Sequence, residues 1–141
     1  MKKIILRIAI LICGLLILVL IYNQLPEAEL ASNKHIDKIV IEKSKRQLHV
    51  FSEKKVLKTY NISLGFNPVG DKEFEGDGKT PEGKYIINDK NPNSSFYLNL
   101  GISYPDQNDI ESAKEFGRSP GGDIKIHGLR NGLGIIGKFH R

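Results

Sequence analysis

His127 is the residue whose type and surroundings point most directly to chemistry. It ends a run in which Ile124 and Ile126 alternate with other residues, and a glycine-rich segment, 128–134, follows it. This pattern predicts a β-strand that holds the histidine at its base and leaves the ring open at the entry to a loop. Histidine titrates near pH ~6.5, so it can take up or release a proton at neutral pH. From the residues alone, a structural histidine and a catalytic base are equal interpretations.

Two other motifs near His127 suggest different chemistry, but neither pattern is complete. The stretch GLGIIG, 132–137, has the glycine spacing of a dinucleotide-binding loop, which needs a following helix and an acid about 20 residues on. Only KFHR follows it, so we interpret it as a glycine-rich turn. Asp123, His127 and His140 are conceivable metal ligands, but two histidines thirteen residues apart are a weak pattern. We therefore expect no metal and no cofactor.

The N-terminus carries a long apolar run, Ile4 to Tyr22, interrupted by a single charge, Arg7. As a helix, these residues would span about 28 Å, close to the ~30 Å hydrocarbon thickness of a bilayer. Basic residues precede the run and acidic residues follow it, which places the N-terminus in the cytoplasm and the rest outside. A cleavable signal peptide is the alternative, but the run is long for one and no small-x-small cleavage site follows. We expect a single-pass anchor in the cytoplasmic membrane.

Composition narrows the possible partners. The net charge of +5 falls to +2 once Lys2, Lys3 and Arg7 are set aside, because 18 basic residues then face 16 acidic ones. Basic residues do not cluster with aromatic ones, so nucleic acid is not an expected partner. Cys13 is the only cysteine, and it lies in the apolar run.

The chain divides into an anchor (1–22), a linker (23–35) and one domain (36–141). Residues 36–64 alternate in hydrophobicity and predict three strands, with turns at 44–46 and 53–55. The segment 67–83 is rich in glycine, proline and charge, and predicts a long loop of the kind that is often functional. Strands are expected again at 84–87, 96–104 and 123–127, and a helix at 109–116 capped by Asn108 or Asp109. The expected fold class is mainly β with one short helix.

Three separate stretches together resemble a known family. They are GDGKTPEGKY at 76–85, ISYP at 102–105 and SPGGDIKIHG at 119–128. In this order and at these distances, they are similar to the L,D-transpeptidase catalytic domain of bacterial cell-wall enzymes. The resemblance runs from about residue 36 to residue 141.

The resemblance implies a mostly β domain whose sheets frame a groove for peptidoglycan stem peptides. In such enzymes a cysteine thiolate attacks the stem peptide at its third residue, usually a diamino acid, and terminal D-alanine leaves. An amine of a second stem then resolves the acyl-enzyme into a 3→3 crosslink, and some relatives use water instead. His127 matches the histidine that takes the thiol proton. The residues implied in substrate binding are Gly121, Gly122, Asp123, Gly128 and Tyr104.

One feature departs from the family pattern. The nucleophile is expected in a Ser/Thr-x-Gly-Cys stretch roughly twenty residues after the His-Gly pair, and the family's last strands follow it. No cysteine, serine or threonine follows His127 in this chain. We therefore expect the chain to lack cysteine-dependent activity, and to be of marginal stability because of an unpaired sheet edge.

Two hypotheses follow from this departure. The first is a transpeptidase-family enzyme, or a peptidase or amidase of that family, whose sequence is incomplete. The second is a non-catalytic, membrane-anchored module that binds peptidoglycan. The intact motifs around His127 favour the first.

Overall fold

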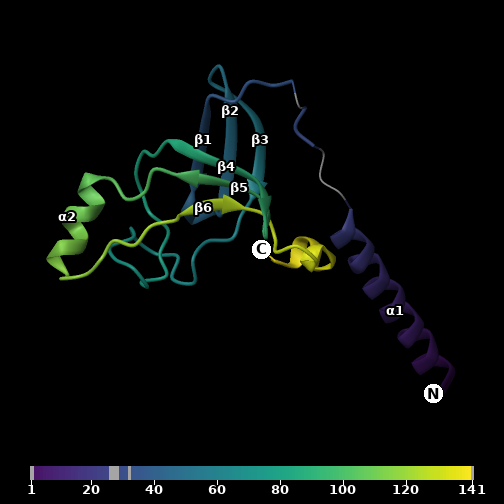
Figure 1. Cartoon of the computed structure of the whole chain (residues 1–141). Coiled ribbons are helices and arrows are strands. Elements are labelled where there is room, and N and C mark those ends of the chain that lie inside the picture. Colours follow the sequence, from purple (N-terminus) through teal and green to yellow (C-terminus); the bar gives the residue numbers. More distant parts are fainter. Residues whose placement is uncertain (1, 26–28, 32, 141) are drawn as a thin grey trace.

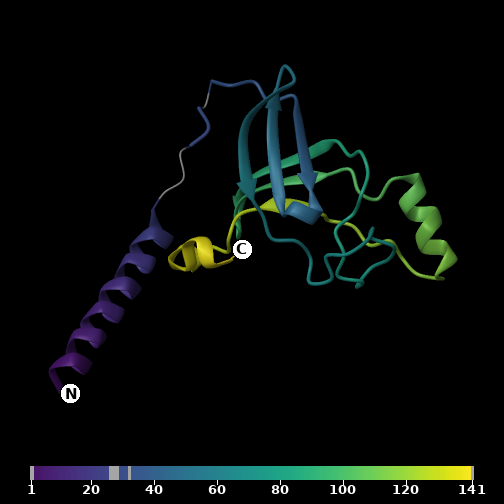
Figure 2. The same cartoon turned by 180° about the vertical axis from the view of Figure 1, so that it is seen from behind.

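The computed structural model describes residues 2–25, 29–31 and 33–140, with the side chains of 137–140 left aside. An N-terminal helix, α1 (Lys2–Gln24), stands apart from a domain built of two small sheets and a second helix, α2 (Gln107–Glu115) (Figure 1). Seen from behind, the two sheets lie together while α1 and α2 project from opposite sides (Figure 2). The predicted class, mainly β with one short helix and an apolar N-terminal helix, is confirmed.

The first sheet has the antiparallel order β1-β2-β3. Its strands are β1 (Lys38–Glu42), β2 (Gln47–Ser52) and β3 (Lys55–Asn61). Ile39 pairs with Val50 and Ile41 with Leu48, and the β2 partners of both pairs are buried. The predicted turn after β1 is a short 3₁₀ helix, η1 (Lys43–Lys45), closed by Arg46 in the left-handed conformation at φ 51°.

The second sheet has the antiparallel order β4-β5-β6. Its strands are β4 (Ile87–Ser94), β5 (Tyr97–Ile102) and β6 (Lys125–His127). The strand expected at 84–87 begins instead at Ile87 and continues through the polar stretch NDKNPNS. Sequence pattern missed it because no apolar alternation marks it, and pairing with β5 overrides weak local propensity. Pro92 lies where the register shifts between Asn91 and Ser94, a position that tolerates proline.

Helix α2 begins two residues earlier than predicted, and neither Asn108 nor Asp109 is its cap. Asp106 is the N-cap, and its side chain accepts hydrogen bonds from the backbone N–H groups of Asn108 and Asp109. The Asp109 carboxylate in turn accepts from the Asp106 backbone N–H at 2.7 Å, which completes a capping box. This reciprocal pairing satisfies the backbone N–H groups at the start of the helix, so α2 begins at Gln107 and not at residue 109.

The hydrophobic core of the described residues is small. Its buried apolar members are Leu48, Val50, Tyr104 and Ala113, and none of the larger ones is fully enclosed. Beyond β6, the predicted glycine-rich turn is instead part of a 3₁₀ helix, η2 (Leu133–His140). Helix η2 contacts the end of α1, where the Asn23 side-chain amide donates to the Ile136 carbonyl at 2.9 Å.

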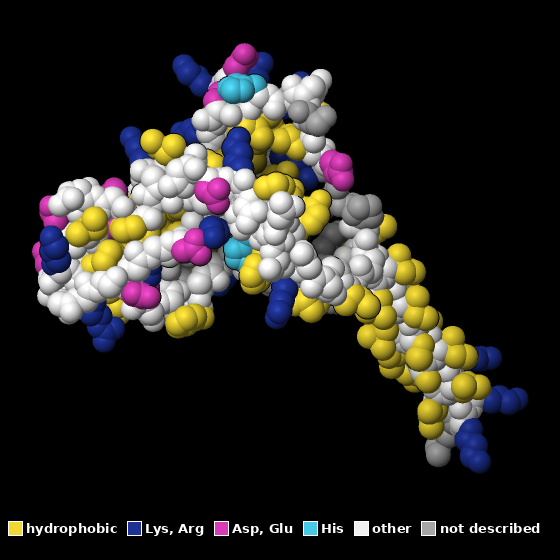
Figure 3. Space-filling model, in the orientation of Figure 1, with side chains coloured by type: hydrophobic (Ala, Val, Ile, Leu, Met, Phe, Trp, Pro, Cys, Tyr) yellow, Lys and Arg dark blue, Asp and Glu magenta, His cyan; other side chains and the backbone are white. Residues whose placement is uncertain are grey.

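Helix α1 is long and apolar enough to cross a membrane, and a signal sequence near an N-terminus would have the same properties. Its 23 residues correspond to about 35 Å of helix. Hydrophobic side chains cover the visible length of α1, and basic side chains gather at its N-terminal end (Figure 3). Its apolar residues do not contribute to the domain core, so burial in the domain does not explain them.

Candidate functional site

His127 is the last residue of β6, which is an edge strand of the second sheet. Its ring is exposed, and its Nδ1 lies 2.7 Å from the carbonyl oxygen of Gly128. A carbonyl oxygen only accepts hydrogen bonds, so this contact assigns the proton to Nδ1. The neutral ring then carries its lone pair on Nε2, which makes Nε2 the nitrogen able to take a proton.

The turn between β4 and β5 packs against His127. The Phe96 ring centroid lies 4.8 Å from that of His127, with the two planes tilted by 57°. The Gly128 backbone N–H donates to the Phe96 carbonyl at 3.1 Å. A Cβ at Gly128 would stand 3.2 Å from the Phe96 oxygen and from the Tyr97 Cβ, so a side chain there would push the turn away. Gly128 therefore sets the distance between the turn and the histidine.

Across the strand pair, Asn99 of β5 is the register partner of His127. Asn99 is buried, and its Oδ1 has no hydrogen-bond partner among the described residues. An unpaired buried acceptor costs free energy unless a group supplied from outside satisfies it. Sequence pattern did not point to Asn99, because only the register places it opposite the histidine.

Gly121, Gly122 and Asp123 form the turn that leads into β6. Gly121 has φ 73° and Asp123 has φ 58°, both in the left-handed region. A Cβ at Gly121 would meet the side chain of Glu75 at 3.2 Å, so the turn lies against the long loop. The exposed Asp123 carboxylate forms an ion pair with Lys125 at 2.5 Å. Their predicted contact with substrate stays a prediction.

Tyr104 is buried, with 6% of its surface exposed, and its hydroxyl donates to the Pro120 carbonyl at 2.9 Å. Burial raises the pKa of its phenol to about 12, and the nearby Asp109 charge adds to the shift. Tyr104 follows β5 and contacts residue 120, whereas His127 pairs with Asn99. β5 pairs with β6 and with the residue just before β6. His127 lies at one end of this paired stretch, and Tyr104 lies at the other. In this arrangement Tyr104 supports the Gly121 turn, and its predicted role in substrate binding stays a prediction.

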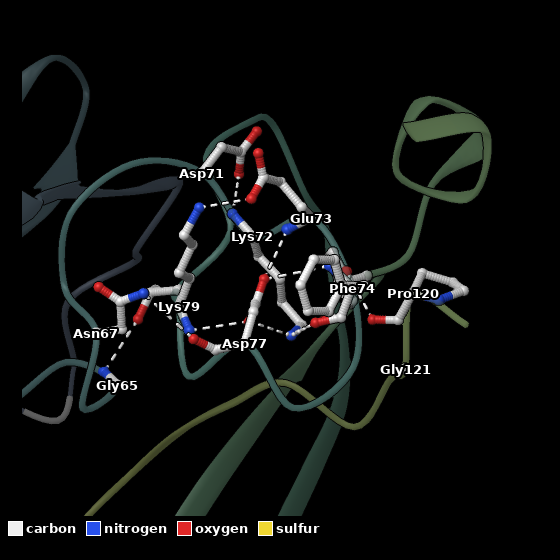
Figure 4. A network of polar contacts seen from close by, with 12 residues as sticks. Gly65, Asn67, Asp71, Lys72, Glu73, Phe74, Asp77, Lys79, Pro120 and Gly121 are labelled. Carbon is white, nitrogen blue, oxygen red and sulfur yellow. Dashed lines mark hydrogen bonds and ion pairs between the residues drawn. The ribbon is translucent and has the colours of Figure 1, made fainter. Parts of the chain in front are cut away.

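The long loop, 67–83, is organised around the buried carboxylate of Asp77 (Figure 4). This carboxylate accepts hydrogen bonds from the backbone N–H groups of Glu73 (2.7 Å), Phe74 (3.2 Å) and Lys79 (3.0 Å). It also accepts from the ammonium of Lys72 at 2.9 Å, and both side chains are less than 10% exposed. Burial on its own would raise the pKa of Asp77, but these four donors outweigh it and hold the pKa well below its usual value. Asp77 was not among the predicted site residues, although its place between two glycines is typical of a turn.

Three contacts tie this loop to the segment that leads into β6. The Glu75 N–H donates to the Ser119 carbonyl at 2.8 Å. The Phe74 ring packs on Phe116 at a centroid distance of 5.3 Å, and the Arg118 guanidinium lies 4.5 Å from its centroid. The loop thus has a defined shape, and its N–H groups at 73, 74 and 79 are occupied by Asp77. These three N–H groups are therefore not free for a ligand.

A cavity of about 470 Å³ lies between this loop and α2, away from His127. Tyr85 lines it, and its hydroxyl is 3.1 Å from both carboxylate oxygens of Asp109. Burial and this hydrogen bond raise the pKa of Tyr85 well above its usual value. The lining carboxylates of Asp71, Asp106 and Asp109 each accept backbone hydrogen bonds, so they are already engaged. In the described part of the chain, no three His, Cys, Asp or Glu residues are grouped as a metal site requires.

The two sheets, the ordered loop and the solvent-facing histidine at a strand end define a mainly β domain of a known class. A family model described as the L,D-transpeptidase catalytic domain (YkuD) matches residues 36–137. The match covers well over half of the chain, and the protein therefore belongs to the L,D-transpeptidase catalytic domain family. No curated protein and no solved structure matches the chain.

Proposed function

We propose that this protein is a membrane-anchored member of the L,D-transpeptidase family whose domain faces the cell wall and binds peptidoglycan stem peptides at the surface around His127. The observation that carries the proposal is the state of the His127 ring. Its Nδ1 donates to the Gly128 carbonyl, so the neutral form of the exposed ring carries its lone pair on Nε2. That is what a general base must present to the group whose proton it takes.

The chain does not supply the thiol that such a base activates. Its only cysteine, Cys13, lies in α1 and faces outward from that helix. If α1 spans the bilayer, Cys13 is within the hydrocarbon layer, whereas His127 belongs to the domain beyond the linker. We infer that these 141 residues bind stem peptides, and we expect no cysteine-dependent acyl transfer from them alone, because none of their side chains offers a thiol near His127.

The test uses the full chain in detergent micelles and a synthetic stem tetrapeptide with a diamino acid at the third position and D-alanine at the fourth. We expect the peptide to bind and to shift the His127 ring resonances in NMR spectra. Mass spectrometry should find neither a 3→3 crosslinked product nor release of D-alanine. Product above the background of a His127→Ala variant would contradict the inferred inactivity, and a lack of binding would contradict the proposed function itself.

The orientation of the anchor has its own test. Lys2 and Lys3 precede the apolar helix, which favours an N-terminus in the cytoplasm. Protease added outside spheroplasts should then digest the domain and leave an N-terminal tag intact. Protection of the domain would place it on the other side, and a cleaved N-terminus in mature protein would identify a signal peptide.

A further inference from the structure

The β4–β5 turn beside His127 presents two aromatic side chains to solvent. Phe96 is 42% exposed and Tyr97 is 69% exposed, although the domain core is short of large apolar side chains. These rings adjoin the candidate base, because Phe96 packs on the His127 ring and Tyr97 lies against Gly128. Figure 1 shows β6 running beside β5, with which it pairs from His127 to Lys125.

Tyr97 holds an unfavourable backbone conformation in this turn. Its φ is 68°, in the left-handed region where a bulky side chain is an outlier. The ring gains little burial in return, since most of its surface is exposed. Glycine or asparagine would adopt the same backbone more easily. Strain of this kind persists where the surroundings enforce it, and it is often found at ligand-binding positions.

Asn131 is the residue that enforces this conformation. Its Oδ1 accepts from the Tyr97 backbone N–H at 2.9 Å, and its Nδ2 donates to the Ser94 carbonyl at 3.1 Å. Its own backbone N–H donates to the Ser95 carbonyl at 2.8 Å. The side chain and backbone of Asn131 thus hold three positions of the turn, 94, 95 and 97. Because Asn131 is only four residues after His127, the turn and the base are fixed to the same segment.

We propose that Phe96 and Tyr97, held by Asn131, form an aromatic binding wall for the stem peptide beside His127. The aliphatic part of the peptide residue next to the bond that family enzymes cleave packs on the exposed rings, while that bond lies toward Nε2. Aromatic rings suit this role because they supply a large contact area with few rotatable bonds. This inference rests on the proposed function, because it names the residues that hold the substrate of that site.

The experiment compares Tyr97→Asn with Lys54→Asn in the full chain in micelles. Tyr97 and Lys54 both have a backbone φ of 68°, which asparagine tolerates better than either residue. Lys54 serves as the control because it lies in the β2–β3 turn of the other sheet. Both variants should unfold at the same or a higher denaturant concentration than the parent protein. Only Tyr97→Asn should weaken tetrapeptide binding, by about tenfold, as expected for loss of one good aromatic contact.

Asn131→Ala supplies a second measurement. It leaves both rings in place but removes two of the three hydrogen bonds that hold the turn. Binding should weaken, and the nuclear Overhauser contact between the Phe96 and His127 rings should weaken with it. Unchanged affinity in Tyr97→Asn would overturn the aromatic wall. If His127→Ala still lowers affinity in that case, the proposed function survives; if the parent protein does not bind at all, both fail.

Discussion

The loop around Asp77 and the surface around His127 are opposite in how they treat an ionisable side chain. Asp77 is enclosed and receives four hydrogen bonds, which keep its carboxylate charged. His127 is exposed, makes one hydrogen bond to its neighbour's carbonyl, and leaves its other ring nitrogen available. The carboxylate of Asp77 is thus fully engaged in hydrogen bonds within the protein, whereas the His127 ring keeps one nitrogen available for a ligand.

This difference indicates which residues shape the domain and which are available for chemistry. The length and composition of the loop predicted a functional segment, yet its central carboxylate is structural. The loop contacts the Gly121 turn through Glu75. It therefore helps to position β6, the strand that carries His127. A well-ordered loop supports the site, and the site itself remains on the surface.

The largest expected effect is on Asp77. Asp77→Ala removes the acceptor for four donors and leaves the Lys72 ammonium buried with only the Phe74 carbonyl. Loss of one partner of a buried ion pair should lower the free energy of unfolding by about 3 kcal/mol or more. Urea denaturation of the full chain in micelles measures it. Asp123→Asn is the control, because it breaks an exposed ion pair while asparagine tolerates the positive φ of this position, and it should change stability by less than about 1 kcal/mol. Equal effects of the two changes would contradict the contrast between the two regions.

The pH dependence of stability is the next largest effect. The pKa of Asp77 is lower in the folded protein than the value of about 3.9 in an unfolded chain. The unfolded state therefore binds the proton more readily, and the stabilisation is full above about pH 4 and declines as pH falls below it. Asp77→Asn lacks this carboxylate, so the stability difference between parent and variant should shrink from pH 6 to pH 2. A constant difference over that range would show that the Asp77 charge does not contribute.

A smaller effect is expected at Tyr85. Its pKa is raised in the folded protein, so its contribution is complete below pH ~10 and declines as pH rises further. Tyr85→Phe removes the hydrogen bond to Asp109 and should cost about 1–2 kcal/mol at pH 7. Tyr97→Phe removes the hydroxyl of a largely exposed ring and serves as the control. If both variants match the parent in denaturant midpoint, the contact with Asp109 is not stabilising.

The smallest effect on stability is expected at His127. His127→Ala removes an exposed ring and should change the free energy of unfolding by less than about 0.5 kcal/mol. The same change should nonetheless abolish the NMR shifts that the stem tetrapeptide induces in neighbouring residues. A large loss of stability with unchanged peptide binding would identify His127 as a structural residue.

Much of the fold was predictable because local pattern determines it. Period-two alternation identified the β1–β2 hairpin, and the apolar run identified α1. The start of α2 was harder to predict, because Asp106, Asn108 and Asp109 are all good caps and only the reciprocal bonds of Asp106 and Asp109 decide between them. Strand β4 was missed because its polar residues become a strand only when β5 supplies the partner.

The sequence by itself determined the mainly β class, the apolar N-terminal helix and the place of His127 at a strand end, because each depends on residues close together in the chain. Only the tertiary structure decided that Tyr104 is buried, that Asp77 organises the loop, and that Asn131 holds an aromatic turn against the histidine. Hydrogen bonds and burial join residues that are distant in sequence, so no local pattern encodes them. His127 could be proposed as a candidate base from the sequence, whereas the residues that surround it are defined by the register of β4, β5 and β6.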